Sequence, residues 1–159
     1  MNKNIFHDTR IAIATSVFNN EITDLLLQGA LARLQECGII QENISVTTVP
    51  GAIELPLVIQ LLAKSKKYQA IICLGAVIRG ETSHFDYVCE QVSSGCQKVM
   101  LKYNIPVIFG VLTTDNMEQA LERVGGKHGH KGIACADTAL EMITIVEKLT
   151  NNILQDMLL

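Results

Sequence analysis

The chain has 159 residues, of which 48% are hydrophobic, and this is enough for one ordinary domain with a full core. Mean hydropathy is high at +0.28, yet no apolar stretch reaches the roughly 18 residues of a membrane-spanning helix, so we expect no membrane partner and extra apolar surface buried between subunits. The net charge of −3 gives no reason to expect a nucleic acid as partner.

Short β-rich stretches alternate with longer helical ones along the chain. The predicted strands are 10–17, 44–49, 70–78 and 106–113, and the predicted helices are 20–38, 55–65, 82–103, 116–124 and 132–154. We expect Gly38 to close the first helix, and Thr82 or Ser83 to open the third as its N-cap. The final stretch, QDMLL, has a less regular pattern.

Strands that are apolar almost throughout indicate a parallel sheet covered on both faces. Four such strands with right-handed crossovers predict a three-layer α/β/α sandwich of the flavodoxin-like kind. Ferredoxin-like packing is the alternative, but it uses fewer helices than this sequence offers. No linker, repeat or low-complexity segment interrupts the chain, so we expect a single domain over residues 1–159.

The cysteines number five, and no two have the C-x-x-C spacing. They are Cys37, Cys73, Cys89, Cys96 and Cys135. Their odd number and apolar surroundings favour buried free thiols in a reducing compartment over disulfides or a zinc site. The N-terminal sequence MNKNIFHDTR lacks the apolar stretch of a signal peptide, so we expect the cytoplasm.

Unusual polar and aromatic residues gather where the predicted strands end. They are Phe18 and Asn19 after the first strand, 50–54 after the second, 79–84 after the third, and 109–115 around the end of the fourth. Ligands of such sheets bind beyond the carboxyl ends of the strands. The sequence therefore predicts a binding site at this rim.

Each of these residues also has a purely structural interpretation. Phe18 can cap the core, and Glu54 can complement a helix dipole. Thr82 and Ser83 can act as helix caps alone. His84 on the first turn of a helix is typical of a surface residue. It is their common position at one rim that favours a site.

A second cluster is the glycine-rich, basic sequence ERVGGKHGHKG at 122–132. It matches neither the Walker loop nor the G-x-G-x-x-G pattern. A basic loop of this kind before a long helix suits an anion, and an exposed basic loop without a ligand is the alternative.

Several motifs, in order and in spacing, resemble the lumazine synthase family (6,7-dimethyl-8-ribityllumazine synthase). They are FNxxIT at 18–23, PGAxELP at 50–56, GxVIRGxTxHFxYV at 75–88, PVxFGVLTT at 106–114, QAxER at 119–123, and KG before an ALEM helix. Any one motif alone would be weak, but together they are highly specific, and the match runs from about residue 10 to 150.

The resemblance implies a transferase of riboflavin biosynthesis that uses no metal and no organic cofactor. Its two small-molecule substrates would be 5-amino-6-(D-ribitylamino)uracil and 3,4-dihydroxy-2-butanone 4-phosphate. Their condensation to 6,7-dimethyl-8-ribityllumazine would release phosphate and water, as the penultimate step of the pathway.

The resemblance also implies roles for individual residues. His84 would transfer protons. The residues that would bind the pyrimidine and its ribityl chain are Phe18, Ala52, Ile53, Glu54, Ala76, Val77, Ile78 and Phe109. Those that would bind the phosphate-bearing substrate are Glu81, Thr82, Arg123 and Lys131. Phe109 and Arg123 would reach the site from the neighbouring subunit, with Lys131 close by.

The stretch 77–88, VIRGETSHFDYV, suits these roles. Amide groups at a helix start bind phosphate, and an imidazole one turn further can transfer protons near neutral pH. We interpret Arg79 as a structural ion-pair partner. Two positions depart from the family pattern: Ile53 replaces a frequent aromatic residue, and His130 replaces the asparagine of GNKG.

The resemblance further implies a homopentamer, assembled into an icosahedral shell of sixty subunits that can enclose riboflavin synthase. Shell-forming members have a short link between the last two helices, and GGKHGHKG has no insertion. The sequence after about Val146 is longer and more apolar than is typical of the family.

Three other functions remain open on the same fold. A non-catalytic cage should have lost His84, Arg123 or Phe18, and all three are present. A flavin- or nucleotide-binding module would carry a Thr/Ser-rich phosphate loop after the first strand, where this chain has SVFNNEIT. Riboflavin synthase of the archaeal type shares the fold, and the fold alone does not separate it.

Overall fold

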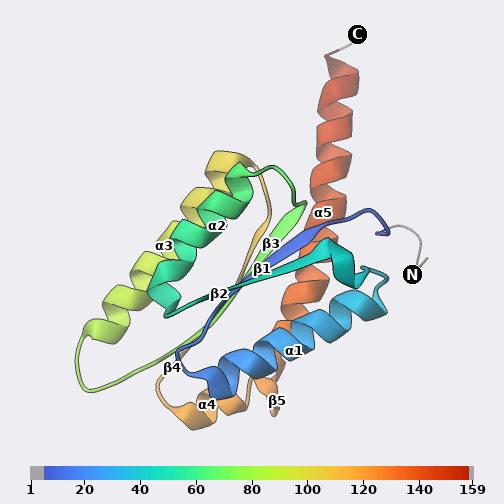
Figure 1. Ribbon diagram of the computed structural model, residues 1–159. Coiled ribbons are helices and arrows are strands. Elements are labelled where there is room, and N and C mark those ends of the chain that lie inside the picture. The colour runs from blue at the N-terminus through green and yellow to red at the C-terminus, as the bar shows by residue number, and fades with distance from the viewer. Residues whose placement is uncertain (1–5, 158–159) are drawn as a thin grey trace.

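The computed structural model describes residues 6–157. A four-stranded sheet lies between two pairs of helices, with α2 and α3 on one face and α1 and α5 on the other (Figure 1). This confirms the predicted three-layer α/β/α sandwich. Residues 1–5 and 158–159 of the predicted domain, which include the end of the apolar tail, lie outside the described residues.

The elements follow one another in the predicted order. The strands of the main sheet are β1 (Ile11–Ser16), β2 (Ile44–Val49), β3 (Ala70–Ile78) and β4 (Val107–Thr114). The α-helices are α1 (Asn20–Glu36), α2 (Leu55–Lys64), α3 (His84–Tyr103), α4 (Met117–Leu121) and α5 (Lys131–Asp156). Short 3₁₀ turns span Gln41–Asn43 and Ala52–Glu54.

All four strands are parallel, in the order β2-β1-β3-β4. The central strand β1 is buried along its whole length, because it has a neighbouring strand on each side and helices on both faces. Ile11 and Ile13 pack towards α1 and α5, while Ala12 and Ala14 pack towards α2 and α3. Burial on both faces explains why the inner strands β1 and β3 are buried almost throughout, whereas the edge strand β2 is partly exposed.

The structure shows how α1 ends and how α3 begins. Gly38 comes one residue after the C-cap of α1 and has a φ of 96°, and Ile39 donates to the Leu34 carbonyl at 3.0 Å. This is a Schellman motif, which favours glycine. Ser83 stands at the N-cap of α3, as predicted, although its side chain makes no capping hydrogen bond. Thr82 Oγ1 instead accepts one from the His84 amide at 3.4 Å.

The cysteines are free thiols, as predicted. Cys73, Cys96 and Cys135 are buried, and Cys37 and Cys89 are half-buried. Cys96 of α3 lies 3.6 Å from Cys73 of β3, sulfur to sulfur. This hydrogen bond and burial both raise the pKa of the Cys73 thiol, which keeps it protonated.

A two-stranded antiparallel ribbon, β5 (Val124–Gly126) with β6 (Gly129–His130), was not predicted. It occupies the basic loop between α4 and α5, where Gly125 and Gly129 adopt left-handed φ values of 115° and 78°. Its strands are too short to give a periodic signal. We call this ribbon the β5–β6 hairpin.

Within residues 6–157 no helix is both long and apolar enough to cross a membrane. The same residues contain no group of three His, Cys, Asp or Glu side chains placed to hold a metal ion.

Candidate active site

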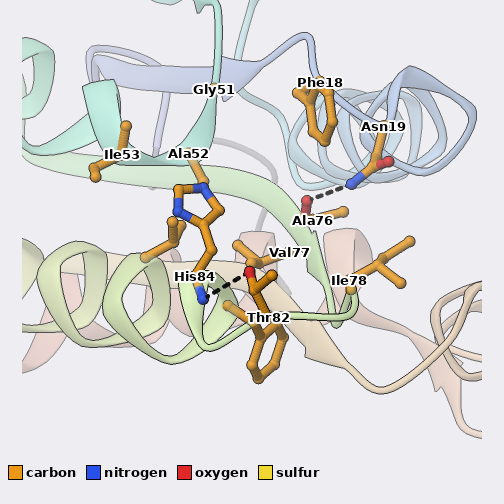
Figure 2. Close-up of a pocket in the computed structure, with 13 residues that line it drawn as sticks. Phe18, Asn19, Gly51, Ala52, Ile53, Ala76, Val77, Ile78, Thr82 and His84 are labelled. Atoms are coloured by element: carbon orange, nitrogen blue, oxygen red, sulfur yellow. Dashed lines mark hydrogen bonds between the residues drawn. The ribbon is translucent and has the colours of Figure 1, made fainter.

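A cleft of about 390 Å³ opens beyond the carboxyl ends of β1, β2 and β3, at the rim that the sequence predicted (Figure 2). We call it the strand-end cleft. Eight predicted site residues line it: Phe18, Ala52, Ile53, Ala76, Val77, Ile78, Thr82 and His84. Five other residues complete the lining: Asn19, Gly51, Gly80, Phe85 and Val88.

Phe18 presents its ring to the cleft directly after β1. The Phe18 amide donates to the Pro50 carbonyl at 2.9 Å, so the chain after β1 is tied to the loop after β2. The Phe18 residue is nevertheless 70% exposed. An aromatic ring held by its backbone and left open to solvent is available to stack on a planar ligand.

Asn19 joins two walls of the strand-end cleft. Its backbone is left-handed (φ 60°, ψ 47°), which asparagine tolerates better than most residues. Its Nδ2 donates to the Ala76 carbonyl at 2.9 Å, and so ties the start of α1 to the end of β3 (Figure 2). The sequence places Asn19 just after the first strand but indicates no role for it, because nothing local signals a partner 57 residues away.

The loop after β2 lines the cleft with Gly51, Ala52 and Ile53. Glu54 turns its carboxylate back to accept from the Gly51 amide at 2.8 Å, and Glu54 does not line the cleft. Ala52 is buried, whereas Ile53 is 40% exposed at the cleft wall. Position 53 therefore offers an aliphatic surface to a ligand.

Arg79 holds the turn between β3 and α3, as the sequence predicted. Its Nε donates to Asp115 at 2.9 Å, and its Nη1 lies 3.4 Å from Asp86. Its guanidinium also lies over the Phe85 ring, 4.2 Å from the centroid. The hydrogen bond with Asp115 raises the pKa of Arg79 above its ordinary value.

His84 is the first residue of α3 and is exposed at the cleft. Its amide donates to Thr82 Oγ1 at 3.4 Å, and its imidazole points across the opening towards Ala52 (Figure 2). An imidazole in this position can exchange protons with a bound ligand. Gly80 and Thr82, which precede α3, line the same cleft.

The remaining predicted residues do not line the strand-end cleft: Glu54, Glu81, Phe109, Arg123 and Lys131. Arg123 lines a separate cleft of about 310 Å³, with Glu118, Gln119, Glu122, Lys127 and His128. We call it the arginine cleft. Arg123 Nη1 donates there to the Gln119 carbonyl at 2.7 Å, and the Lys131 amide donates to the Arg123 carbonyl at 2.8 Å.

The family model of 6,7-dimethyl-8-ribityllumazine synthase matches residues 8–147. The chain belongs to the lumazine synthase family. Proteins named 6,7-dimethyl-8-ribityllumazine synthase from Coxiella burnetii strains CbuG_Q212 and RSA 493 are each 54% identical to it over 140 residues. That stretch covers 88% of this chain and 93% of each relative.

Family membership decides between the interpretations that share this fold. It favours the synthase over a flavodoxin-like nucleotide module and over riboflavin synthase of the archaeal type. The match to the family ends at residue 147, whereas α5 continues to Asp156. The end of α5, which projects beyond the sheet in Figure 1, therefore lies outside the part that matches the family model.

Proposed function

We propose that this chain is a transferase that condenses 5-amino-6-(D-ribitylamino)uracil with 3,4-dihydroxy-2-butanone 4-phosphate. The product is 6,7-dimethyl-8-ribityllumazine, with release of phosphate and water. The 54% identity to proteins named for this product supports the proposal. So does the cleft at the strand ends, which combines an exposed aromatic ring with an exposed imidazole.

We assign the pyrimidine to the strand-end cleft. Phe18 would stack on the ring, and peptide groups of 52–54 and 76–78 would bind its polar edge and the ribityl chain. Peptide groups suit this task because each offers a donor and an acceptor in a fixed direction. The Glu54 carboxylate would reach the ribityl hydroxyls from the edge of the cleft.

The second part of the proposal concerns the phosphate-bearing substrate, which needs cationic partners. No lysine or arginine lines the strand-end cleft within residues 6–157. Arg79 is already paired with two carboxylates. The phosphate would therefore rest on the amide groups around Glu81 and Thr82 and on Arg123 and Lys131 of a neighbouring subunit.

A site divided in this way requires head-to-tail contact between subunits, in which each chain supplies two different surfaces. Phe109 would enter the pyrimidine side from the same neighbour as Arg123. Several large apolar side chains are exposed on the α2 and α3 side and suit such contacts. They are Leu57, Leu61, Tyr87 and Leu101. We propose a closed pentamer, assembled further into an icosahedral shell that can enclose riboflavin synthase.

The chemistry needs positioning and proton transfer. The amine of one substrate attacks the carbonyl of the other and a first water leaves as the imine forms. Phosphate is then eliminated, and the ribitylamino nitrogen closes the ring on the remaining carbonyl with loss of a second water. Holding two substrates in their reactive orientation lowers the activation free energy by up to ~7–11 kcal/mol in favourable cases. Proton transfer by His84 would add ~10²–10⁴-fold. We propose that residues 1–159 act as one cytoplasmic domain and that the reaction needs no cofactor.

The direct test is incubation of the purified protein with both substrates, while lumazine fluorescence and phosphate release are followed together. We expect one phosphate for each lumazine formed. Phosphate release without lumazine, or no reaction by a fully assembled protein, would contradict the proposed function.

A further inference from the structure

His130 occupies the junction between the β5–β6 hairpin and α5. In the hairpin it lies directly opposite Val124, the residue after Arg123. At α5 it is the N-cap, and its Nδ1 accepts a hydrogen bond from the Ile133 amide at 3.4 Å. The next residue, Lys131, donates its amide to the Arg123 carbonyl at 2.8 Å. The position of His130 is thus linked directly to the backbone of Arg123.

The imidazole of His130 rests against Gly29 in the middle of α1. A Cβ atom added at Gly29 would lie 2.7 Å from Nδ1 and 2.8 Å from Nε2 of this ring, which real side chains do not permit. Gly29 does not have a left-handed φ, so its backbone does not require glycine. Glycine is also a poor helix former, so helix propensity does not explain its presence in α1. The space that Gly29 leaves for the His130 ring does explain it.

Gly125 of the hairpin lies near Cδ2 of the His130 ring, because a Cβ atom added at Gly125 would be 3.7 Å from it, an ordinary van der Waals contact. Two residues after His130, Gly132 is in such close contact with the Leu26 backbone of α1 that a side chain there would collide with it. The start of α5 is therefore pressed onto α1, and the imidazole is the side chain that fills the space between α1 and the hairpin.

We propose that His130, seated against Gly29, is a positioning residue that holds the β5–β6 hairpin and so fixes Arg123 for the phosphate-bearing substrate. The Arg123 side chain is held to α4 through the Gln119 carbonyl, and its backbone is held by Lys131. Only the second of these anchors depends on His130. The inference rests on the proposed role of Arg123.

Four variants test it: His130→Ala, Gly29→Ala, His130→Asn, and Gly29→Ala combined with His130→Asn. Asparagine is smaller than histidine and is an equally suitable N-cap, so the double variant keeps the cap and makes room for the new methyl group. Gln28→Ala, at an exposed neighbouring position of α1, is the matched control. The measurements are the Kd for inorganic phosphate, the KM for each substrate, and the melting temperature.

We expect His130→Ala and Gly29→Ala each to weaken phosphate binding about tenfold, as for a loosened charge-assisted hydrogen bond. The KM for the phosphate-bearing substrate should rise in parallel, while the KM for the pyrimidine stays within about twofold. In the His130→Asn background, Gly29→Ala should leave phosphate binding unchanged and raise the melting temperature, because alanine is the better helix former.

Equal effects of Gly29→Ala in both backgrounds, equal losses for both substrates, or normal phosphate binding by His130→Ala would overturn the inference. So would a wild-type assembly that binds no inorganic phosphate. If the wild-type protein binds phosphate but forms no lumazine, the proposed function fails, and the binding and melting measurements still decide the role of His130.

Discussion

The strand-end cleft and the arginine cleft are built in different ways. The first lies on the ends of buried strands and the first turn of the 20-residue helix α3, and its turn is held by the ion pairs of Arg79. The second is built from a five-residue helix, α4, and a hairpin whose strands have three and two residues. The contrast suggests that proton transfer and pyrimidine binding are fixed by the core, whereas phosphate binding depends on a few local contacts.

The largest effect should come from the proton-transfer group of the strand-end cleft. We expect His84→Ala to lower kcat by about 10²-fold or less, because the positioning of two substrates survives its removal. Steady-state kinetics with both substrates checks this, with Glu90→Gln, at an exposed position of α3 outside both clefts, as a control that should leave kcat nearly unchanged. Complete loss of turnover with normal assembly and substrate binding would show that His84 does more than transfer protons.

Arg123→Ala tests the other cleft. We expect the KM for the phosphate-bearing substrate to rise about 30-fold and the KM for the pyrimidine to stay nearly constant, because a charged, forked donor is lost. Arg123→Lys, which keeps the charge but not the fork, should give an intermediate rise. An equal loss of affinity for both substrates would remove the distinction between the two clefts.

Phe18→Ala should have the opposite selectivity. The loss of one aromatic stacking partner should raise the KM for the pyrimidine about tenfold, with little change for the phosphate-bearing substrate. Phe18→Tyr keeps a ring at this exposed position and should bind the pyrimidine nearly as well as the wild type. If removal of the ring changes neither KM, Phe18 does not stack on the substrate.

The smallest effect is expected from loss of the hydrogen bond between Asn19, which precedes α1, and the Ala76 carbonyl of β3. Asn19→Gly removes the hydrogen bond to the Ala76 carbonyl but tolerates the left-handed backbone, and should cost about 1 kcal/mol of stability. Asn19→Ala adds backbone strain and should cost roughly twice as much. Thermal unfolding of both variants checks the order, and an alanine variant as stable as the glycine variant would contradict it.

Long elements were predictable from the sequence, and short or long-range features were not. The bounds of β2 and β3 were predicted correctly, because these stretches rich in β-branched residues end at Pro50 and Arg79, each followed by a glycine. The β5–β6 hairpin was missed, because strands of two or three residues carry no periodic pattern. The contact of His130 with Gly29 joins residues a hundred positions apart, and only the folded chain brings them together.

The candidate site shows the same division. The family motifs named the eight predicted residues that line the strand-end cleft. These residues lie together because parallel strands bring their carboxyl ends to one rim. The motifs did not indicate that Glu54 would bond to Gly51 or that Asn19 would hold Ala76. The proposed assignment of Arg123 to a neighbouring subunit comes from the family resemblance and is supported by its separate cleft.

The central claim is that each complete site combines the strand-end cleft of one subunit with the arginine cleft of the next. It is tested most directly by joint refolding of His84→Ala subunits with Arg123→Ala subunits. An interface is complete when the arginine variant supplies His84 and the histidine variant supplies Arg123. With equal random mixing in a head-to-tail ring, about one interface in four meets this condition.

When assayed with the phosphate-bearing substrate well below its KM, where each variant alone has little activity, the jointly refolded proteins should therefore regain roughly a quarter of wild-type activity, with no gain after simple mixing without subunit exchange. Native mass measurement of the refolded particles verifies that both variants share the same assemblies. Co-assembled particles that stay as inactive as their parents would contradict the account, because each site would then lie within a single chain.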